Sequence, residues 1–144
     1  DLINVMAKLQ GQETSCANSI AQKAAVEALI GDQSSMIEMK ETFRKRRDLM
    51  IDLLNEIPQI SCEKPKGAFY AFPDCSEYFG TQCDGKTITT STELSEFILE
   101  ESKVVTVPGD GFGAPGYIRF SYAVSSEIIK KGIGRLRQAL DKIN

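Results

Sequence analysis

Two apolar runs joined by a glycine-rich turn narrow the possible folds of this chain more than any other feature. The runs are "VVTVPG", residues 104–109, and "YIRFSYA", residues 117–123, with "DGFGAPG" between them. Short runs rich in β-branched and aromatic residues, bounded by glycine and proline, are typical of strands. We therefore expect both runs to be strands of a small, mainly antiparallel sheet.

An arginine, Arg119, lies in the middle of the second run. A buried guanidinium needs an anion beside it, because an unpaired buried charge is costly. One interpretation is a salt bridge to a carboxylate of this chain. The other is a bidentate clamp on the carboxylate of a substrate, which the planar fork of arginine suits well. The residues alone leave both interpretations open.

Apolar residues recur at helical spacing in five further segments, and small polar residues or glycine bound them. Gly11 and Gly31 are expected to end the first two helices, and Thr92 to cap the fourth. In the last helix, Ile128 is expected to face inward together with Ile129. The expected helices are residues 2–10, 20–31, 35–57, 93–102 and 127–143.

The segments between the helices complete the expected fold. Residues 59–74 predict two short strands around a Pro-Lys-Gly turn, and residues 74–91 are polar enough for a surface loop. Three helices are thus followed by the order β-β-α-β-β-α. This order indicates an α+β fold, in which helices cover one side of a small antiparallel or mixed sheet.

Composition excludes several classes of function. The 144 residues include 17 Lys and Arg against 20 Asp and Glu, for a net charge of -3, which does not suit a nucleic-acid binder. The basic run "RKRRD" is interpreted as the solvated face of the long helix. No apolar run reaches the roughly 20 residues of a membrane helix, and no signal peptide opens the chain. We expect a cytoplasmic protein with no membrane or nucleic-acid partner.

The chain contains no histidine and four cysteines without a CxxC pair. The missing histidine excludes Ser-His and Cys-His nucleophiles, and a structural zinc site lacks clustered ligands. No metal site and no catalytic residue is therefore predicted. The stretch "GDGFGA" fits the dinucleotide-binding pattern G-x-G-x-x-A, but a strand follows it where that function requires a helix. We interpret it as a turn between strands.

The strings "GAFYAFPD" (67–74) and "VVTVPGDGFGAPGYIRFSYA" (104–123) resemble the C-terminal part of class I pyridoxal-phosphate aminotransferases. They are most similar to the bacterial-type aspartate aminotransferases. "KLQGQETSCANSIAQKAA" resembles the helix-loop-helix that follows the cofactor-binding lysine region in that family. The resemblance implies the small C-terminal domain of a fold-type I enzyme. Residues 1–31 would then form the junction with the large domain, and residues 32–144 the small domain with its long connecting helix.

The resemblance also implies roles for single residues. Arg119 matches the family arginine that forks onto the α-carboxylate of the substrate. Phe69 and Tyr70 match strand residues that we expect to pack the small domain rather than to touch substrate. Both roles are expectations from the family and not from the spacing of these residues.

A loop near the N-terminus carries a second implied site. The loop "TSCANS" matches a family loop that approaches the active site of the neighbouring subunit, which makes Thr14, Ser15 and Asn18 candidate residues. The commoner family sequence is "TSNPTS". Cys16 and Ala17 replace Asn and Pro here, so this loop departs from the family sequence at two of the positions that would face cofactor or substrate.

The function implied is transfer of the amino group of L-aspartate to 2-oxoglutarate by a homodimer that uses pyridoxal phosphate. The chain starts at Asp1 inside a helical pattern, so we expect a piece of a longer protein, inactive alone, with the cofactor-binding lysine upstream. Three alternatives stay open. They are an aminotransferase of aromatic or other specificity, the aminotransferase-like effector domain of a transcription regulator, and a free-standing ligand-binding protein.

Overall fold

The computed structural model describes residues 1–83 and 85–143, which divide into two compact units, Asp1–Glu38 and Met39–Asn144. The division falls inside helix α3 (Ser34–Asn55), a few residues after the boundary at residue 31 expected from the sequence. The two units are described separately. Among the described residues, no helix is both long and apolar enough to cross a membrane.

The first unit consists of α1 (Leu2–Glu13), α2 (Ser19–Ile30) and the first turn of α3. Helix α1 continues through Gly11, where it was expected to end, because an interior glycine only disfavours a helix by about 1 kcal/mol. Asn18 caps α2, since its Oδ1 accepts a hydrogen bond from Ile20 N at 2.9 Å. Gly31 is the C-cap, as expected.

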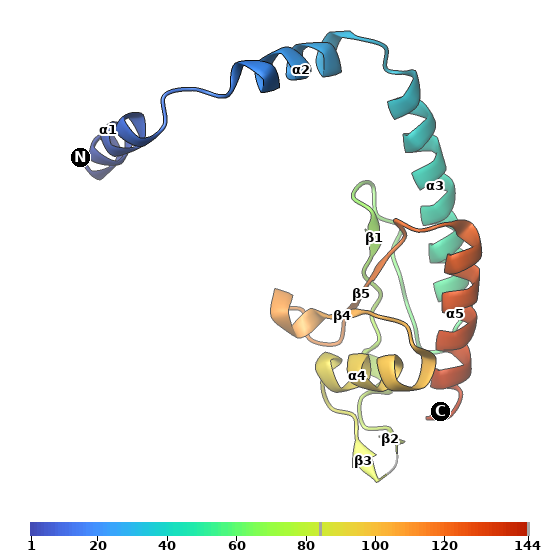
Figure 1. The fold of residues 1–144 in the computed structure, drawn as a ribbon. Helices are drawn as coiled ribbons and strands as arrows, with labels where there is room; N and C mark the ends of the chain where they lie inside the picture. The colour runs from blue at the N-terminus through green and yellow to red at the C-terminus, as the bar shows by residue number, and fades with distance from the viewer. Residues whose placement is uncertain (84, 144) are drawn as a thin grey trace. The chain divides into compact units, whose positions relative to one another are not determined.

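The second unit is built around an antiparallel three-stranded sheet (Figure 1). Its strands are β1 (Tyr70–Ala71), β4 (Val107–Pro108) and β5 (Ile118–Ser121), in the order β1-β5-β4. Val107 pairs with Arg119, so the two apolar runs do form neighbouring antiparallel strands. The first run is a much shorter strand than expected, with only two residues in the ladder.

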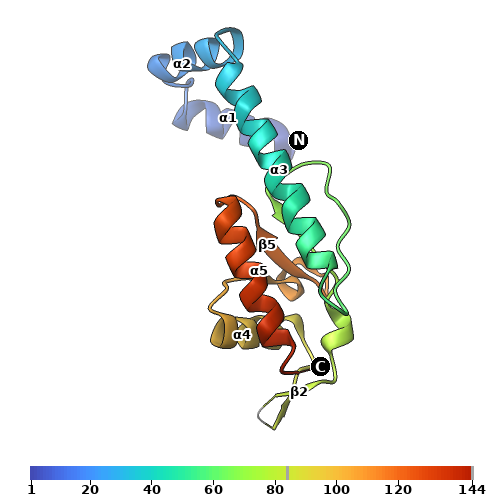
Figure 2. The ribbon, with the colours of Figure 1, turned by 90° about the vertical axis from the view of Figure 1, so that its right-hand side faces the viewer.

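Helices cover one side of this sheet. The part of α3 after Met39 and helix α5 (Ser126–Leu140) lie on the same side of the strands in both views, and α4 (Ser91–Ser102) packs against α5 and β4 (Figures 1 and 2). Ile118 and Phe120 of β5 are buried with the helices in one core. The expected α+β class is confirmed. The helical members of this core include Met50, Ile51, Leu54, Leu94, Ile98, Ile129, Ile133, Leu136 and Leu140.

The segment before α4 differs from its prediction. One isolated bridge, Ser61 to Asp74, replaces the first of the two expected strands. The expected polar loop contains a 3-10 helix, η1 (Ser76–Tyr78), and a hairpin of β2 (Gln82–Cys83) and β3 (Lys86–Thr87). It is also anchored, because the fully buried Tyr78 donates its hydroxyl to Pro58 O at 2.7 Å. Two adjacent aromatic residues, Tyr78 and Phe79, among polar residues give little sequence signal for such an anchor.

The N-cap of α4 and the core face of α5 differ in part from the sequence-based expectation. Thr90, not Thr92, caps α4 in a capping box with Glu93. Ser125 caps α5, because its side chain accepts a hydrogen bond from Ile128 N. Ile128 is 57% exposed, so its inward placement was wrong. Its neighbour Ile129 takes the core position, because successive helical residues point about 100° apart.

Candidate functional site

Arg119 projects from the central strand of the sheet on the side opposite the helices. Its neighbours Ile118 and Phe120 are buried in the core, and side chains alternate along a strand, so Arg119 points to the other face. On that face it is half-buried, whereas Ser121 is exposed. The charge of Arg119 therefore lies on the open face of the sheet and outside the core.

Two aromatic rings lie within contact distance of the guanidinium group of Arg119. Its Cζ lies 5.1 Å from the ring centroid of Tyr70 and 4.9 Å from that of Phe112. Tyr70 belongs to β1, and Phe112 ends the 3-10 helix η2 (Gly109–Phe112) that follows β4. The rings thus come from the segments on either side of β5. Both distances are within the range of cation–π attraction.

No carboxylate of the described residues forms an ion pair with Arg119. The ion pairs found in this part of the chain join other residues: Arg44–Glu41, Arg47–Asp48, Lys64–Asp48 and Lys142–Glu101. Of the two interpretations of this arginine, the internal salt bridge is therefore not observed. The other interpretation, a clamp on the carboxylate of a substrate, stays a prediction.

Asp110, the acidic residue of the glycine-rich turn, is held elsewhere. Its Oδ2 accepts hydrogen bonds from Thr92 N at 2.9 Å and from Thr92 Oγ1 at 2.8 Å. These bonds tie the turn to the first turn of α4, where a negative charge is favoured by the helix dipole. Asp110 is thus engaged at α4 instead of neutralising Arg119.

The turn that carries Phe112 folds back on itself. Gly109 N donates to Tyr117 O at 2.8 Å, and Ala114 N donates to Gly109 O at 3.0 Å. A Cβ on Gly109 would lie 2.2 Å from Ala114 O and 2.5 Å from Tyr117 O, so only glycine fits there. The turn leads into strand β5 and not into a helix. The dinucleotide-binding interpretation of "GDGFGA" is therefore excluded.

Further aromatic residues surround the two rings. Phe69 meets Tyr70 edge-on at 5.4 Å between centroids, and Phe72 meets Phe112 edge-on at 6.2 Å and Tyr117 at 5.2 Å. We call Arg119 and these aromatic residues the Arg119 cluster. It consists of Arg119, Phe69, Tyr70, Phe72, Phe112 and Tyr117.

Phe69 and Tyr70 contact each other, and Tyr70 contacts Arg119, but neither residue is buried in the core of this unit. Phe69 is 53% exposed and Tyr70 38% exposed. Ala71 takes the buried position of β1, which places Tyr70 on the open face. Strand alternation could have revealed Tyr70. Phe112 was missed because a glycine-rich turn carries no periodic signal, and only the tertiary structure brings it to Arg119.

The other predicted site residues lie in the first unit, between α1 and α2. Thr14 Oγ1 donates to Gln10 O at 3.2 Å at the end of α1, and Asn18 caps α2. Ser15 is exposed. These residues and Arg119 belong to different compact units. Their role toward a neighbouring subunit stays a prediction.

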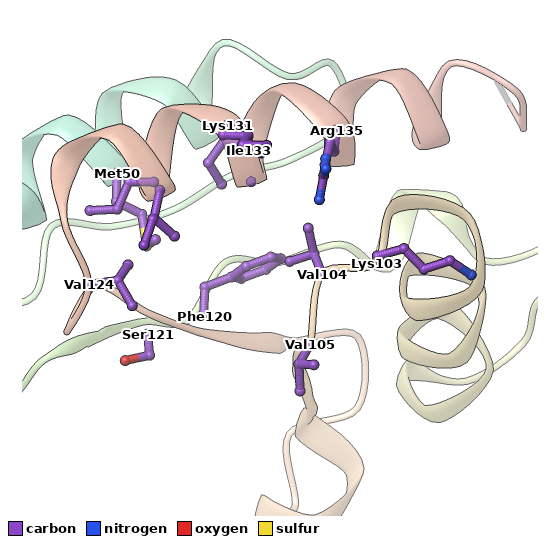
Figure 3. A pocket seen from close by; sticks show the side chains of 13 residues that line it. Met50, Lys103, Val104, Val105, Phe120, Ser121, Val124, Lys131, Ile133 and Arg135 are labelled. Carbon is purple, nitrogen blue, oxygen red and sulfur yellow. The ribbon is translucent and has the colours of Figure 1, made fainter.

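A hollow of about 460 Å³ lies on the helix side of the sheet (Figure 3). Phe120 and Ile129 contribute to its apolar lining, and Lys103, Lys131 and Arg135 are its charged residues. Lys103 Nζ donates to Glu100 O at 2.7 Å. The hollow therefore combines apolar surface with three positively charged side chains and has no carboxylate or thiol in its lining.

The buried thiols are poor nucleophiles. Burial raises the pKa of Cys75 to about 12, and burial is also the main cause that raises the pKa of Cys62. Both thiols therefore stay protonated near neutral pH, and the thiolate is the reactive form. In the described part of the chain, no three Cys, Asp or Glu side chains gather as metal ligands.

The chain is similar to known aminotransferases over most of its length. Residues 1–136 match the family described as aminotransferase class I and II. A probable aspartate/prephenate aminotransferase of Rickettsia typhi is 43% identical over 99% of this chain and 36% of its own length. An aspartate aminotransferase of Rhizobium meliloti is 41% identical over 100% of this chain and 35% of its own length.

Solved structures give the same result. The crystal structure of the aspartate aminotransferase from Rhizobium meliloti matches with a TM-score of 0.89 and 41% identity, over 99% of this chain and 36% of that one. An aromatic aminotransferase from Pyrococcus horikoshii matches with a TM-score of 0.81 and 35% identity, over 97% of this chain and 36% of that one. The fold is thus that of fold-type I aminotransferases.

The chain belongs to the aminotransferase class I and II family, which confirms the resemblance seen in the sequence. It spans about a third of the length of the curated relatives it matches. The family depends on pyridoxal phosphate. The Arg119 cluster offers rings, hydroxyls and a guanidinium but no lysine amine, so these residues alone do not fit a covalently held cofactor.

Proposed function

We propose that this chain is part of an aspartate aminotransferase, in which Arg119 binds the α-carboxylate of the amino-acid substrate. The observation that carries the proposal is an arginine on an open sheet face, between two rings and without a protein carboxylate. The names of the relatives from Rickettsia typhi and Rhizobium meliloti, at 43% and 41% identity, support aspartate as the amino donor. The acceptor would be 2-oxoglutarate.

In this proposal Arg119 does the work of recognition and orientation. Two parallel N–H donors of a guanidinium match the two oxygens of a carboxylate, and the pair fixes direction as well as distance. Holding the substrate in one orientation lowers the entropy cost of the following step. The aromatic residues beside Arg119 exclude water from one side of the pair, which strengthens it.

The cofactor would be held by residues other than the Arg119 cluster. When bound, pyridoxal phosphate supplies the electron sink for amino transfer. We propose that its lysine lies in the part of the relatives that this chain does not cover. Residues 1–31 would then join the large domain to the small domain of residues 32–144, and the chain by itself would be inactive.

We further propose a cytoplasmic homodimer in which Thr14, Ser15 and Asn18 approach the active site of the neighbouring subunit. Ser15 is exposed, and Asn18 keeps its loop in place by capping α2. Cap hydrogen bonds of this kind fix the direction in which a loop enters a helix. The small polar groups of this loop would be suited to contacts with a cofactor or substrate across a subunit boundary.

A second substrate class has support of its own. One relative is named for both aspartate and prephenate, and one matching structure is of an aromatic aminotransferase. Prephenate or an aromatic amino acid is therefore the alternative partner of the same site. Arg119 would bind the α-carboxylate in either case, because that group is common to all these substrates.

The test uses the longer protein that contains this chain, reconstituted with pyridoxal phosphate. L-Aspartate is expected to change the absorbance of the bound cofactor, and 2-oxoglutarate to restore it. If L-phenylalanine or L-tyrosine changes the spectrum and L-aspartate does not, the aromatic alternative replaces aspartate. If no amino acid changes it, the family's effector-domain function becomes the better explanation.

Arg119→Lys tests the residue itself. Lysine keeps the charge but loses the bidentate fork, so the concentration of L-aspartate for half-conversion is expected to rise about 10- to 100-fold. Arg135→Lys makes the same exchange on the helix side of the sheet and is expected to stay within about twofold. Equal effects of the two exchanges would contradict the proposed role of Arg119 in substrate binding.

A further inference from the structure

We propose that Tyr70 and Phe112 are positioning residues that hold the Arg119 guanidinium ready for a carboxylate. The proposal rests on the function proposed above for Arg119. It concerns the two rings, which would not touch the substrate's carboxylate but would set the direction in which the arginine meets it.

The rings come from separate segments of the chain. Tyr70 is paired in register with Ser121, two residues beyond Arg119 on β5, and its ring lies 5.1 Å from Arg119 Cζ. Phe112 follows β4, the strand on the other side of β5, and lies 4.9 Å from the same atom. Arg119 is thus contacted by one ring from β1 and by one ring from the turn that follows β4, the two strands on either side of β5.

Tyr70 and Phe112 each pack against a further aromatic ring. Phe69 meets Tyr70 at 79° between ring planes, and Phe72 meets Phe112 at 90°. Edge-to-face pairs of this kind are favourable and directional. Tyr70 and Phe112 are therefore supported in their orientation, although they are 38% and 54% exposed. Their exposure also means that burial in the core does not account for their position.

The chemistry of a guanidinium explains what such contacts achieve. All five N–H donors lie in the plane of the group, whereas its faces make no hydrogen bonds. Two rings within cation–π range of the group restrict its rotation, and no carboxylate of the described residues is ion-paired with it. Arginine otherwise loses considerable side-chain freedom on binding. Ordering the group before the substrate arrives reduces that cost.

The first measurement is made on the 144-residue chain and does not depend on catalysis. The NMR signal of Arg119 Nε–H, identified by its loss in Arg119→Lys, is expected to be shifted by the ring currents of Tyr70 and Phe112. Tyr70→Ala and Phe112→Ala should each move it, and Tyr70→Phe should not. The signal of Arg46, whose Cζ lies 5.6 Å from the ring of Phe43, should stay in place throughout.

The second measurement is kinetic and uses the longer protein with its cofactor. Each alanine variant is expected to raise KM for the amino donor about three- to thirtyfold, with kcat within about twofold. The reason is that the carboxylate is bound equally in the ground state and the transition state. Tyr70→Phe and Phe112→Tyr keep the rings and should restore KM. Leu99→Ala, which shortens another exposed apolar side chain, is the matched control.

The outcomes separate this proposal from the function on which it rests. If the unchanged protein responds to amino acids but the alanine variants keep its KM, the positioning role is overturned. It is also overturned if the Arg119 signal does not move in either variant. If the unchanged protein responds to no amino acid, the proposed function fails, and this role in substrate binding fails with it.

Discussion

Neighbouring residues of β5 point to opposite faces of the sheet. Ile118 and Phe120 contribute to the core beneath the helices, and Arg119 between them reaches the open face. The change from buried to open face between successive residues follows from the alternation of side chains along a strand. A position in such a strand is therefore best judged from the face it shares with residues two positions away.

The hydroxyl of Tyr78 gives a prediction at this scale. Burial raises the pKa of Tyr78 to about 12 in the folded protein, above the value of 10.0 expected when it is exposed. The folded state holds this proton more tightly, so stability is lost as pH rises from about 10 through 12. Tyr78→Phe is expected to reduce this alkaline loss. It should cost about 1 kcal/mol at pH 7, because Pro58 O loses its donor.

Urea unfolding at pH 8 and at pH 11 measures both effects. The unchanged chain should lose more stability between the two pH values than Tyr78→Phe does. Tyr117→Phe, at a hydroxyl on a partly exposed ring, is the control and should behave like the unchanged chain. An equal alkaline loss in all three proteins would contradict the prediction.

Among the elements, the turn between β4 and β5 has the most demanding geometry. It carries Phe112, is tied to α4 through Asp110, and closes on Gly109 by two backbone hydrogen bonds. A turn with this many constraints can present a side chain in one direction without being buried itself. The same constraints make it sensitive to a single added methyl group.

Gly109→Ala is expected to destabilise the second unit by about 2 kcal/mol or more. The added Cβ would lie 2.2 Å from the backbone oxygen of Ala114, which cannot move without breaking the turn. Gly111→Ala is the matched control two residues away, where no atom lies within 4 Å, and should change stability by less than about 0.5 kcal/mol. Chemical denaturation of both variants compares them directly, and similar losses would disprove this account of the turn.

On the scale of the whole molecule, the two units differ in how they are stabilised. The second unit has a continuous core, whereas no side chain of α1 or α2 is buried. Helices of 12 residues are marginal in water without packing. Large apolar side chains such as Leu2, Met6 and Leu29 are exposed in this unit, which is consistent with a chain that spans about a third of its relatives.

Limited proteolysis of the 144-residue chain is expected to cut first within residues 1–38. Segments without buried side chains open at little free-energy cost, and proteases act on the opened form. The core from Met39 onward should persist as a fragment identifiable by mass spectrometry. Early cuts inside α4 or α5 would show instead that the second unit does not hold together in this chain.

The helices, the antiparallel pair of apolar runs and the arginine within the second run could all be predicted from the amino-acid sequence. These follow from local physics, because the spacing of apolar residues and the caps act over a few positions. The family could also be predicted from the sequence, through the strings at residues 67–74 and 104–123, and the family match covers residues 1–136.

The surroundings of Arg119 depend on tertiary packing and could not be predicted from the sequence. Tyr70 precedes it by almost 50 residues, Phe112 lies in an aperiodic turn, and Asp110 is bound to the start of α4. The anchoring of the expected loop by Tyr78 to Pro58 is likewise a contact between distant positions. Such contacts depend on how the elements pack, and the residues that make them carry no local signal of their partners.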